Sequence, residues 1–141
     1  MKFLTAIVFA TATILTAADG GVTYVGHDKV SAALSKGGPL VTANDLIVSG
    51  SHRDKAGQVE VHDKETDVLY VVDGSATFVT GGTMVGGKVT KPNQHGGTSI
   101  NGGQTHLLTK GDVIVVPAGT AHWFKDVPQS ISYYVVKVVK Q

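Results

Sequence analysis

The segment from Gly111 to Phe124, GDVIVVPAGTAHWF, restricts the fold more than any other part of the chain. Its apolar run, 113–116, lies between a Gly turn and a Pro, which predicts a short buried strand rather than a helix. Beyond the Pro-Ala-Gly turn a second strand is predicted, with His122 and Phe124 on one side and Trp123 on the other. His122 then has two interpretations: a core histidine with its own hydrogen bonds, or a ligand whose partners lie elsewhere in the chain.

Most of the chain after residue 40 has the same short-strand pattern. Runs of β-branched and aromatic residues recur at regular spacing, and Gly-rich turns separate them. This spacing predicts an all-β fold, an antiparallel sandwich or barrel. The runs are NDLIVSGSHR, QVEVH, DVLYVV, SATFVT, DVIVV and ISYYVVKVVK.

Two segments depart from this pattern. Residues 28–36 have helical periodicity, with Asp28 as the expected cap and Gly37 as the end, so we expect one short helix packed outside the barrel. The stretch 84–104, MVGGKVTKPNQHGGTSINGGQ, is rich in Gly and poor in apolar residues. We expect it to be a mobile loop over one end of the barrel, either functional or a plain insertion.

The N-terminus has the features of a secretory signal peptide. Lys2 precedes an apolar run, Phe3 to Leu15, that is short for a bilayer span, and small residues suit cleavage after Ala18. A membrane anchor or a buried first helix is the alternative. The expected protein is therefore secreted or periplasmic, with three parts: a signal peptide, 1–18, an extension with the short helix, 19–39, and one β-barrel domain, 40–141.

Composition narrows the expected partners and chemistry. The 12 Lys and Arg against 11 Asp and Glu give a formal net charge of +1 without a basic cluster, so nucleic acid is not an expected partner. No membrane contact is expected after signal cleavage. Because the chain has no Cys, thiolate ligands and Cys nucleophiles are excluded, and His and the carboxylates become the main candidates.

Partners for His122 occur in the sequence VEVHDKETDVLYVVDG. Glu60 and His62 are two residues apart on a strand and point the same way, and a tight hairpin can set Asp67 opposite them. Polar groups directed into an apolar barrel are costly unless something satisfies them, and a divalent cation does so. Two imidazoles with up to two carboxylates suit iron(II), manganese, zinc, nickel or cobalt better than calcium or magnesium. We therefore predict one divalent transition metal bound by Glu60, His62, Asp67 and His122.

The chain resembles the cupin superfamily through its second motif, G-x5-P-x-G-x2-H-x3-N. Gly111, Pro117, Gly119 and His122 match this motif at every spacing, with Asp126 at the usual Asn position. Four fixed residues in order rarely coincide by chance.

The first motif of that superfamily, G-x5-H-x-H-x(3,4)-E-x6-G, matches in spacing but differs in identity. His62 falls on its second His, Asp67 on its Glu and Gly74 on its closing Gly, whereas Glu60 replaces the first His and Asp54 the leading Gly. The resemblance covers roughly residues 46–139. It implies an antiparallel jelly-roll β-barrel that binds one metal, and the Glu60 position leaves its activity open.

Two roles stay open within the predicted site. Glu60 is either a ligand or a catalytic acid and base beside the metal. Asp67, one methylene shorter than Glu, reaches the metal either directly or through water. His106 either lines the same cavity or lies on an exposed strand position. The remaining histidines, expected at the surface or in the Gly-rich loop, are His27, His52 and His95.

The aromatic residues divide between packing and the pocket. Tyr133 is expected to pack within the barrel, and Phe124 or Tyr134 is the candidate for lining the pocket.

Three functions fit these residues. The first is a secreted metal enzyme acting on a small polar molecule, of isomerase, lyase, hydrolytic or dioxygenase type. The second is a module that binds a metal or small ligand without turnover, and the third is a barrel whose polar cluster is satisfied internally. A homodimer is expected, with the last strand, Ile131 to Val139, either paired internally or exposed as the dimer edge.

Overall fold

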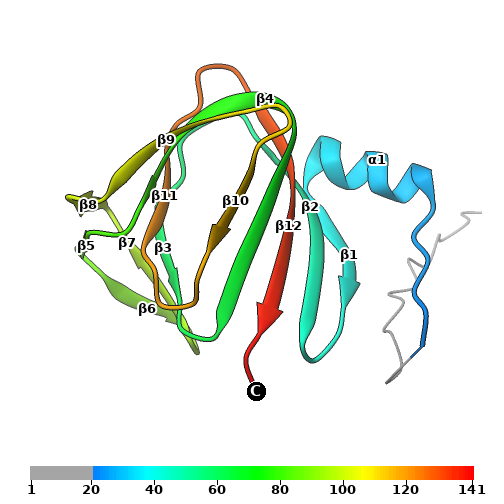
Figure 1. Ribbon diagram of the computed structural model, residues 1–141, viewed down its shortest axis with the longest axis horizontal. Coiled ribbons are helices and arrows are strands. Elements are labelled where there is room, and N and C mark those ends of the chain that lie inside the picture. The colour runs from blue at the N-terminus through cyan, green and yellow to red at the C-terminus, as the bar shows by residue number, and fades with distance from the viewer. Residues whose placement is uncertain (1–20) are drawn as a thin grey trace, which may run out of the picture.

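A computed structural model describes residues 21–141 of the protein. The predicted signal peptide, 1–18, lies outside the described residues. Within 21–141, no helix has the length and apolar character needed to cross a bilayer. The elements, drawn in Figure 1, are α1 (His27–Lys36), β1 (Gly38–Thr42), β2 (Leu46–Arg53), β3 (Val59–His62), β4 (Glu65–Thr80), β5 (Thr83–Val85), β6 (Lys88–Lys91), β7 (Gln94–Gly97), β8 (Ser99–Asn101), β9 (Gln104–Thr109), β10 (Val113–Val116), β11 (His122–Asp126) and β12 (Ile131–Val139).

Helix α1 lies outside the sheet, beside β1 and β2 (Figure 1). Its buried residue, Ala33, rests on Gly50 of β2, where an added Cβ would come within 2.8 Å of the Ala33 Cβ. The helix ends at Gly37, as predicted, and the N–H of Gly37 donates to the Ala33 carbonyl at 2.9 Å. The predicted cap at Asp28 is wrong. The residue before the helix is Gly26, without a side-chain cap, and Asp28 lies inside the first turn, where its charge favours the positive end of the helix dipole.

Antiparallel pairing builds a 10-stranded curled sheet that opens at one side (Figure 1), and β5 and β8 form a separate 2-stranded sheet. Its strand order is β1-β2-β12-β4-β11-β3-β7-β6. The long strand β4 connects the two halves of the curl, because its first half pairs with β12 and β10 and its second half with β11 and β9. The predicted all-β antiparallel barrel with one short helix is confirmed.

The interior of the curl has an apolar end and a polar end, which the register of β4 and β12 sets. Val135 of β12 lies opposite Leu69 of β4, and two residues further Lys137 lies opposite Asp67. Burial of the apolar side chains contributes about 1.5–3 kcal/mol each to folding, so the apolar end stabilises the barrel and the polar end can carry a site. The core residues are Leu69, Val71, Ala76, Phe78, Leu108, Val116, Phe124, Val127, Ile131 and Tyr133.

The segment 84–104 is ordered into short strands, so the predicted mobile loop is wrong. Strand β7 pairs with β3 and sets Gln94 opposite His62. The Gly residues of this segment serve close packing, since a Cβ on Gly97 would lie 2.8 Å from the Val85 carbonyl oxygen. The composition that suggested mobility therefore reflects tight contacts between neighbouring strands.

The last strand, β12, has a partner on each side. It pairs with β2 along one edge and with β4 along the other, over nearly its whole length. Of the two alternatives for this strand, internal pairing is correct, and β12 offers no free edge for a second chain.

Candidate metal centre

The pairing of β3 with β11 joins the two parts of the candidate site. His122 lies opposite Glu60, and His62 follows Glu60 by two residues on the same side of β3. The turn before β11 is tied to β3 as well, because Gly119 donates its N–H to the His62 carbonyl at 2.8 Å. Gly119 has φ 81°, a conformation that residues with side chains adopt only at a cost. The sequence motif around this Gly thus positions both histidines.

The four predicted ligands meet at one point. Glu60 Oε2 is 3.8 Å from His122 Nε2 and 3.9 Å from His62 Nε2. Asp67 Oδ2 is 3.5 Å from His62 Nε2 and 3.8 Å from His122 Nε2. Both imidazoles are buried, at 7% and 5% exposure, with ring centroids 5.0 Å apart.

The second nitrogen of each imidazole is held by an oxygen. Nδ1 of His122 donates to the Thr120 carbonyl at 3.1 Å, and Nδ1 of His62 donates to the side-chain oxygen of Gln94. Because these oxygens only accept, Nδ1 carries the hydrogen, and in the neutral imidazole the lone pair is on Nε2. The two Nε2 atoms are the ones that face Glu60 and Asp67. Histidines that bind metals are generally fixed in this way by a bond from the other nitrogen.

Asp67 has a cationic partner inside the barrel. Lys137 Nζ donates to Asp67 Oδ1 at 2.9 Å and to Oδ2 at 3.0 Å, and it lies 2.9 Å from Glu65 Oε2. Asp67 is 4% exposed, so this ion pair is buried on the Asp67 side. Both carboxylate oxygens of Asp67 are therefore engaged, and a metal bound at Oδ2 would share that atom with Lys137.

The neighbouring groups shift the pKa values of His62 and His122 in opposite directions. Burial lowers the pKa of His62, but the hydrogen bond and the charge of Asp67 outweigh burial and the opposing Lys137, so the pKa is raised above 6.5. For His122 burial dominates, and its pKa lies below 6.5. Burial raises the pKa of Asp67, but the hydrogen bonds from His62 and Lys137 outweigh it and hold the pKa below 3.8. In the metal-free protein near neutral pH, Asp67 is thus ionised beside a neutral His122.

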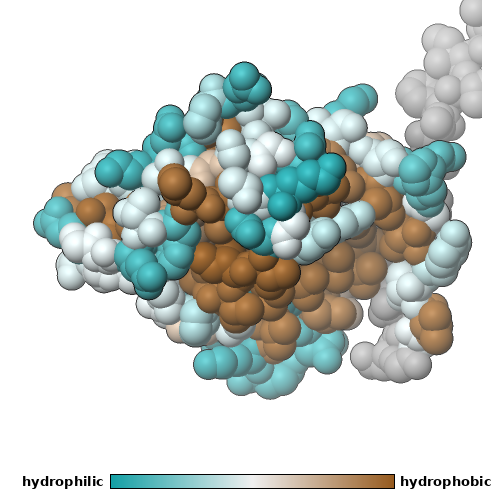
Figure 2. Space-filling model, turned by 45° about the horizontal axis from the view of Figure 1, so that its top comes forward, coloured by the Kyte–Doolittle hydropathy of each residue, from teal (hydrophilic) through white to brown (hydrophobic). Residues whose placement is uncertain are grey.

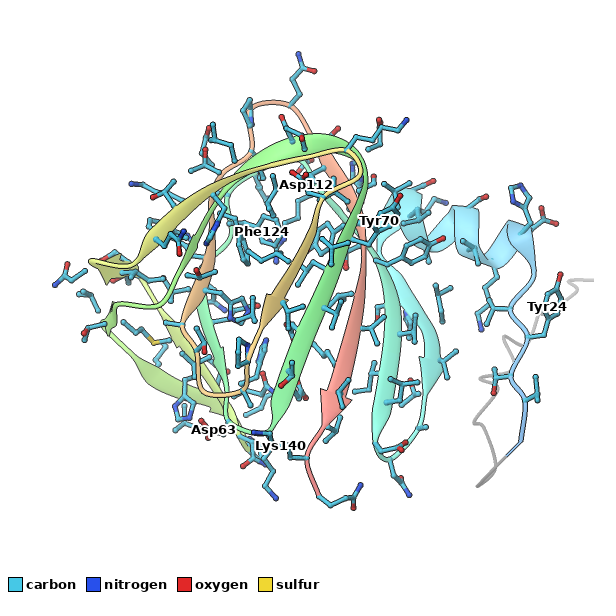
Figure 3. All side chains as sticks on the ribbon, in the orientation of Figure 1. Tyr24, Asp63, Tyr70, Asp112, Phe124 and Lys140 are labelled. Carbon is cyan, nitrogen blue, oxygen red and sulfur yellow. The ribbon has the colours of Figure 1, made fainter. Side chains whose placement is uncertain are left out.

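These residues line an open cavity of about 800 Å³, a size typical of small-molecule sites. Phe124, labelled in Figure 3, lies inside the curled sheet and lines the cavity, as its position two residues from His122 predicts. Tyr134 does not line this cavity. Tyr133 does, because the odd-numbered residues of β12 face inward.

The donor set fits a divalent transition metal. Bonds of about 2.1 Å would place neighbouring donors about 3.0–3.4 Å apart. The carboxylate oxygens of this site lie 3.5–3.9 Å from the imidazole nitrogens. Side-chain rotation can close such a difference. Glu60, His62 and His122 form one group of donors within 4.8 Å of one another, and His62, Glu65 and Asp67 form another. Imidazole nitrogens combined with carboxylates suit iron(II), manganese, zinc, nickel or cobalt.

The other histidines lie outside the cavity. His106 is 2.9 Å from the Thr80 hydroxyl, and His95 is 2.8 Å from Asp63 Oδ2. Of the two alternatives for His106, the structure therefore supports a position outside the site. Those with exposed positions are His27 and His52.

Several residues that shape the site were missed in the sequence. Lys137 had a signal, since it interrupts the inward-facing apolar series of Ile131, Tyr133 and Val135. Gln94 had none, because its partner His62 is distant in sequence and its own segment looked like a loop. The residues missed in this way are Arg53, Glu65, Gln94 and Lys137.

Comparisons with known proteins agree with this architecture. The family model described as Cupin matches residues 44–139. A structure from Bacillus halodurans has a TM-score of 0.60 at 16% identity, covering 87% of this chain and 86% of that one. KdgF from Halomonas sp. has a TM-score of 0.53 at 15% identity, covering 74% and 77%. A conserved protein from Streptococcus pyogenes has a TM-score of 0.51 at 17% identity, covering 73% and 72%. At these identities the structures support the fold alone. The comparison with curated proteins gave no match.

Proposed function

The chain belongs to the cupin family, and on this premise we propose that Glu60, His62 and His122 hold one divalent transition metal at a cavity for a small polar molecule. The proposed activity is enzymatic, of isomerase, lyase or dioxygenase type. In this proposal Glu60 is a metal ligand and not a catalytic acid and base. Asp67 remains paired with Lys137 and does not bind the metal.

The observation that carries the proposal is the common direction of the two imidazoles. Each Nδ1 is bonded to an oxygen, and each Nε2 lies within 4 Å of Glu60 Oε2. This leaves two lone pairs and one carboxylate directed at the same point. Two histidines with one carboxylate is a donor set used by mononuclear iron(II) enzymes, so iron(II) is the first metal to test.

A metal in this site would act as a Lewis acid toward a substrate oxygen or, if it is iron, support chemistry with dioxygen. The chain contributes the surroundings. Leu69, Phe124 and Val135 give the cavity apolar walls that limit water, and Lys137 balances the charges of Glu65 and Asp67. With Glu60 bound, the carboxylates of the cavity within hydrogen-bond distance of Lys137 Nζ are those of Glu65, at 2.9 Å, and Asp67, at 2.9 Å and 3.0 Å.

The decisive experiment is elemental analysis of residues 19–141 purified without chelator. About one equivalent of a transition metal is expected in the parent protein, and little in His62→Ala or His122→Ala. His106→Ala is the matched control, since His106 lies outside the cavity, and it is expected to keep the metal. Absence of metal from the parent after reconstitution, or unchanged content in both site variants, would contradict the proposal.

A binding module without turnover is the second candidate. It is favoured by the position of Asp67 Oδ2, 3.5 Å and 3.8 Å from the two Nε2 atoms, because four protein donors would make a closed site. Water proton relaxation with manganese in the site separates the two. Exchangeable water on the metal supports the enzyme, and its absence supports the module.

The proposed location of the protein is the periplasm or the cell exterior. The supporting feature is the signal-like composition of residues 1–18. N-terminal sequencing of protein recovered from those compartments should begin at Asp19. Recovery of the uncleaved chain from the cytoplasm alone would contradict export.

The proposed assembly is a homodimer that uses the outer face of the sheet. Figure 2 shows a broad hydrophobic area in the middle of one face of the molecule. On the outward sides of β10 and β4, Val113 lies opposite Tyr70, and Val113, Val115 and Tyr70 are 60%, 55% and 46% exposed. Large exposed apolar areas are unusual in monomers, and a two-fold dimer would cover the same area on both chains.

A further inference from the structure

Arg53 is the only arginine of the chain, and it lies in the cavity. The other cationic side chains with a permanent charge are lysines. Arg53 is the last residue of β2, the strand that pairs with β12, and its side chain is half-buried. It shares the cavity with Glu60, His62 and His122.

Two aromatic residues hold the guanidinium in place. Its Nε donates to the Tyr133 hydroxyl at 3.0 Å, and its Cζ lies 4.7 Å from the centre of the Phe124 ring. Both aromatic residues are buried. A guanidinium fixed by a ring and by a hydrogen bond loses little freedom when it binds a ligand, which is the reason arginine suits recognition of planar anions.

The outer nitrogens of this guanidinium have no described counter-charge. Within residues 21–141, no carboxylate oxygen lies within 4.0 Å of Arg53, and the hydrogen bond to Tyr133 uses one of its five N–H groups. Lys137, by contrast, has two carboxylates at 2.9 Å. A half-buried guanidinium that has no anionic partner in the protein is suited to bind an anionic ligand. A carboxylate can accept two parallel hydrogen bonds from it.

Phe124 relates the position of Arg53 to that of the metal ligands, because it contacts Arg53 and shares β11 with His122. Phe124 and His122 are two residues apart on β11 and both face the cavity, so about 7 Å of strand separates them. A molecule of four or five carbon atoms spans about this length. We infer that Arg53 binds the carboxylate of a short-chain acid, whose second oxygen group, a hydroxyl, oxo or carboxylate group, reaches the end formed by Glu60, His62 and His122.

The other charges of the cavity permit an anion there. Lys137 pairs with both Glu65 and Asp67, which removes much of the repulsion that these acids would exert on a bound carboxylate. The first contact, at Arg53, does not depend on a metal. The second contact rests on the proposed function, because the metal would supply it.

The single arginine gives the experiment a unique probe. In a nitrogen-15 spectrum, Arg53 gives the only arginine Nε–H signal, so a ligand at the guanidinium can be followed without assignment. The protein, residues 19–141, is titrated with succinate, once loaded with zinc and once treated with chelator. Succinamide, neutral and of the same shape, is the ligand control.

Succinate is expected to shift the Arg53 signal in both samples, with about tenfold tighter binding in the zinc sample, and succinamide is expected to leave it unchanged. Arg53→Lys keeps the charge but loses the planar guanidinium and, with it, the Nε–H signal, so its succinate affinity is measured by isothermal titration calorimetry beside the parent. This affinity should be weaker by about tenfold or more at unchanged zinc content. Lys55→Gln is the matched control, since Lys55 is exposed and outside the cavity lining, and its succinate affinity should equal that of the parent.

The outcomes separate this inference from the metal proposal. A shift with succinate in a protein that fails to retain zinc after loading supports the Arg53 site and contradicts the metal proposal alone. Retained zinc without any shift at Arg53, or an equal response to succinamide, overturns the Arg53 site and leaves the metal proposal standing.

Discussion

Lys137 lies directly opposite Asp67 across the β4–β12 pair, and its ammonium donates to both oxygens of that carboxylate, at 2.9 Å and 3.0 Å. The same ammonium is 2.9 Å from Glu65 Oε2. One lysine thus pairs with two of the carboxylates that line the cavity and offsets half of their charge. Because the residues before it on the inward face of β12 are apolar, the pair also marks the boundary between core and site.

Lys137→Met should destabilise the protein by about 2–4 kcal/mol, because it leaves the Asp67 carboxylate buried without its cation. The side chain of Lys137 is 21% exposed, so solvent reduces this cost only in part. Urea denaturation at neutral pH, in the presence of chelator, measures the change in the free energy of unfolding. The double variant Lys137→Met/Asp67→Asn is the control and should recover a large part of the loss. A single variant as stable as the parent would contradict a stabilising pair.

Asp67→Asn and Glu60→Gln should differ in their affinity for the metal. Glu60 Oε2 is close to both Nε2 atoms, whereas both oxygens of Asp67 already accept from Lys137. Asp67→Asn should therefore keep the metal at near the parent level, and Glu60→Gln should weaken binding at least tenfold. Titration with zinc and a competing chelator gives both affinities. The reverse order would assign Asp67 as the ligand.

The two histidines of the metal-free protein should titrate on opposite sides of pH 6.5. Burial lowers both pKa values, but the Asp67 carboxylate raises that of His62 above 6.5, and burial keeps that of His122 below it. NMR of the imidazole protons against pH reports both midpoints. In Asp67→Asn the His62 midpoint should fall, while an unchanged midpoint would show that another group raises it.

The same shifts predict how stability depends on pH. The folded pKa of His62 is raised, so its contribution to stability is full below 6.5 and is lost as pH rises through the folded pKa. The folded pKa of Asp67 is lowered, so its contribution is present above 3.8 and is lost as pH falls through the folded pKa. The folded pKa of His122 is lowered, so this residue opposes folding as pH falls below 6.5. The contribution of the His62–Asp67 pair is therefore measured as the difference between the metal-free parent and Asp67→Asn in urea denaturation, and it should be full between pH 3.8 and 6.5.

The sequence predicted the parts of the site that local periodicity and motif spacing encode. The alternation of β3 aligned Glu60 with His62, and the turn around Gly119 aimed His122. It did not predict Lys137 opposite Asp67, because that contact depends on the register of two strands that are distant in sequence. The prediction of a mobile loop at 84–104 was wrong for another reason. A high Gly content occurs both in loops and in closely packed strands, so composition alone does not distinguish them.

Gln94 comes from that segment, and its role gives a further test. Its side-chain oxygen accepts the Nδ1 hydrogen of His62 and so leaves the lone pair on Nε2. Gln94→Leu should lower metal affinity by about 10- to 100-fold without unfolding the barrel. The affinity is measured by competition with a chelator, and circular dichroism checks the fold. Gln104→Leu, at an exposed position of β9, is the control. An unchanged affinity in Gln94→Leu would mean that His62 needs no support from β7.

The proposed dimer can be tested on the outer face of β10. Val115 is 55% exposed beside Val113 and Tyr70, so a second chain that covers this area would bury it. Val115→Lys places a charge in that contact and should weaken dimerisation at least tenfold, because an unpaired charge is costly to bury. Val89→Lys makes the same change at a position of β6 that is 67% exposed, outside this face, and should leave the dimer intact. Light scattering over a concentration series gives the mass of each variant. A parent protein that stays monomeric at high concentration would contradict the dimer, and equal effects of both variants would place the contact elsewhere.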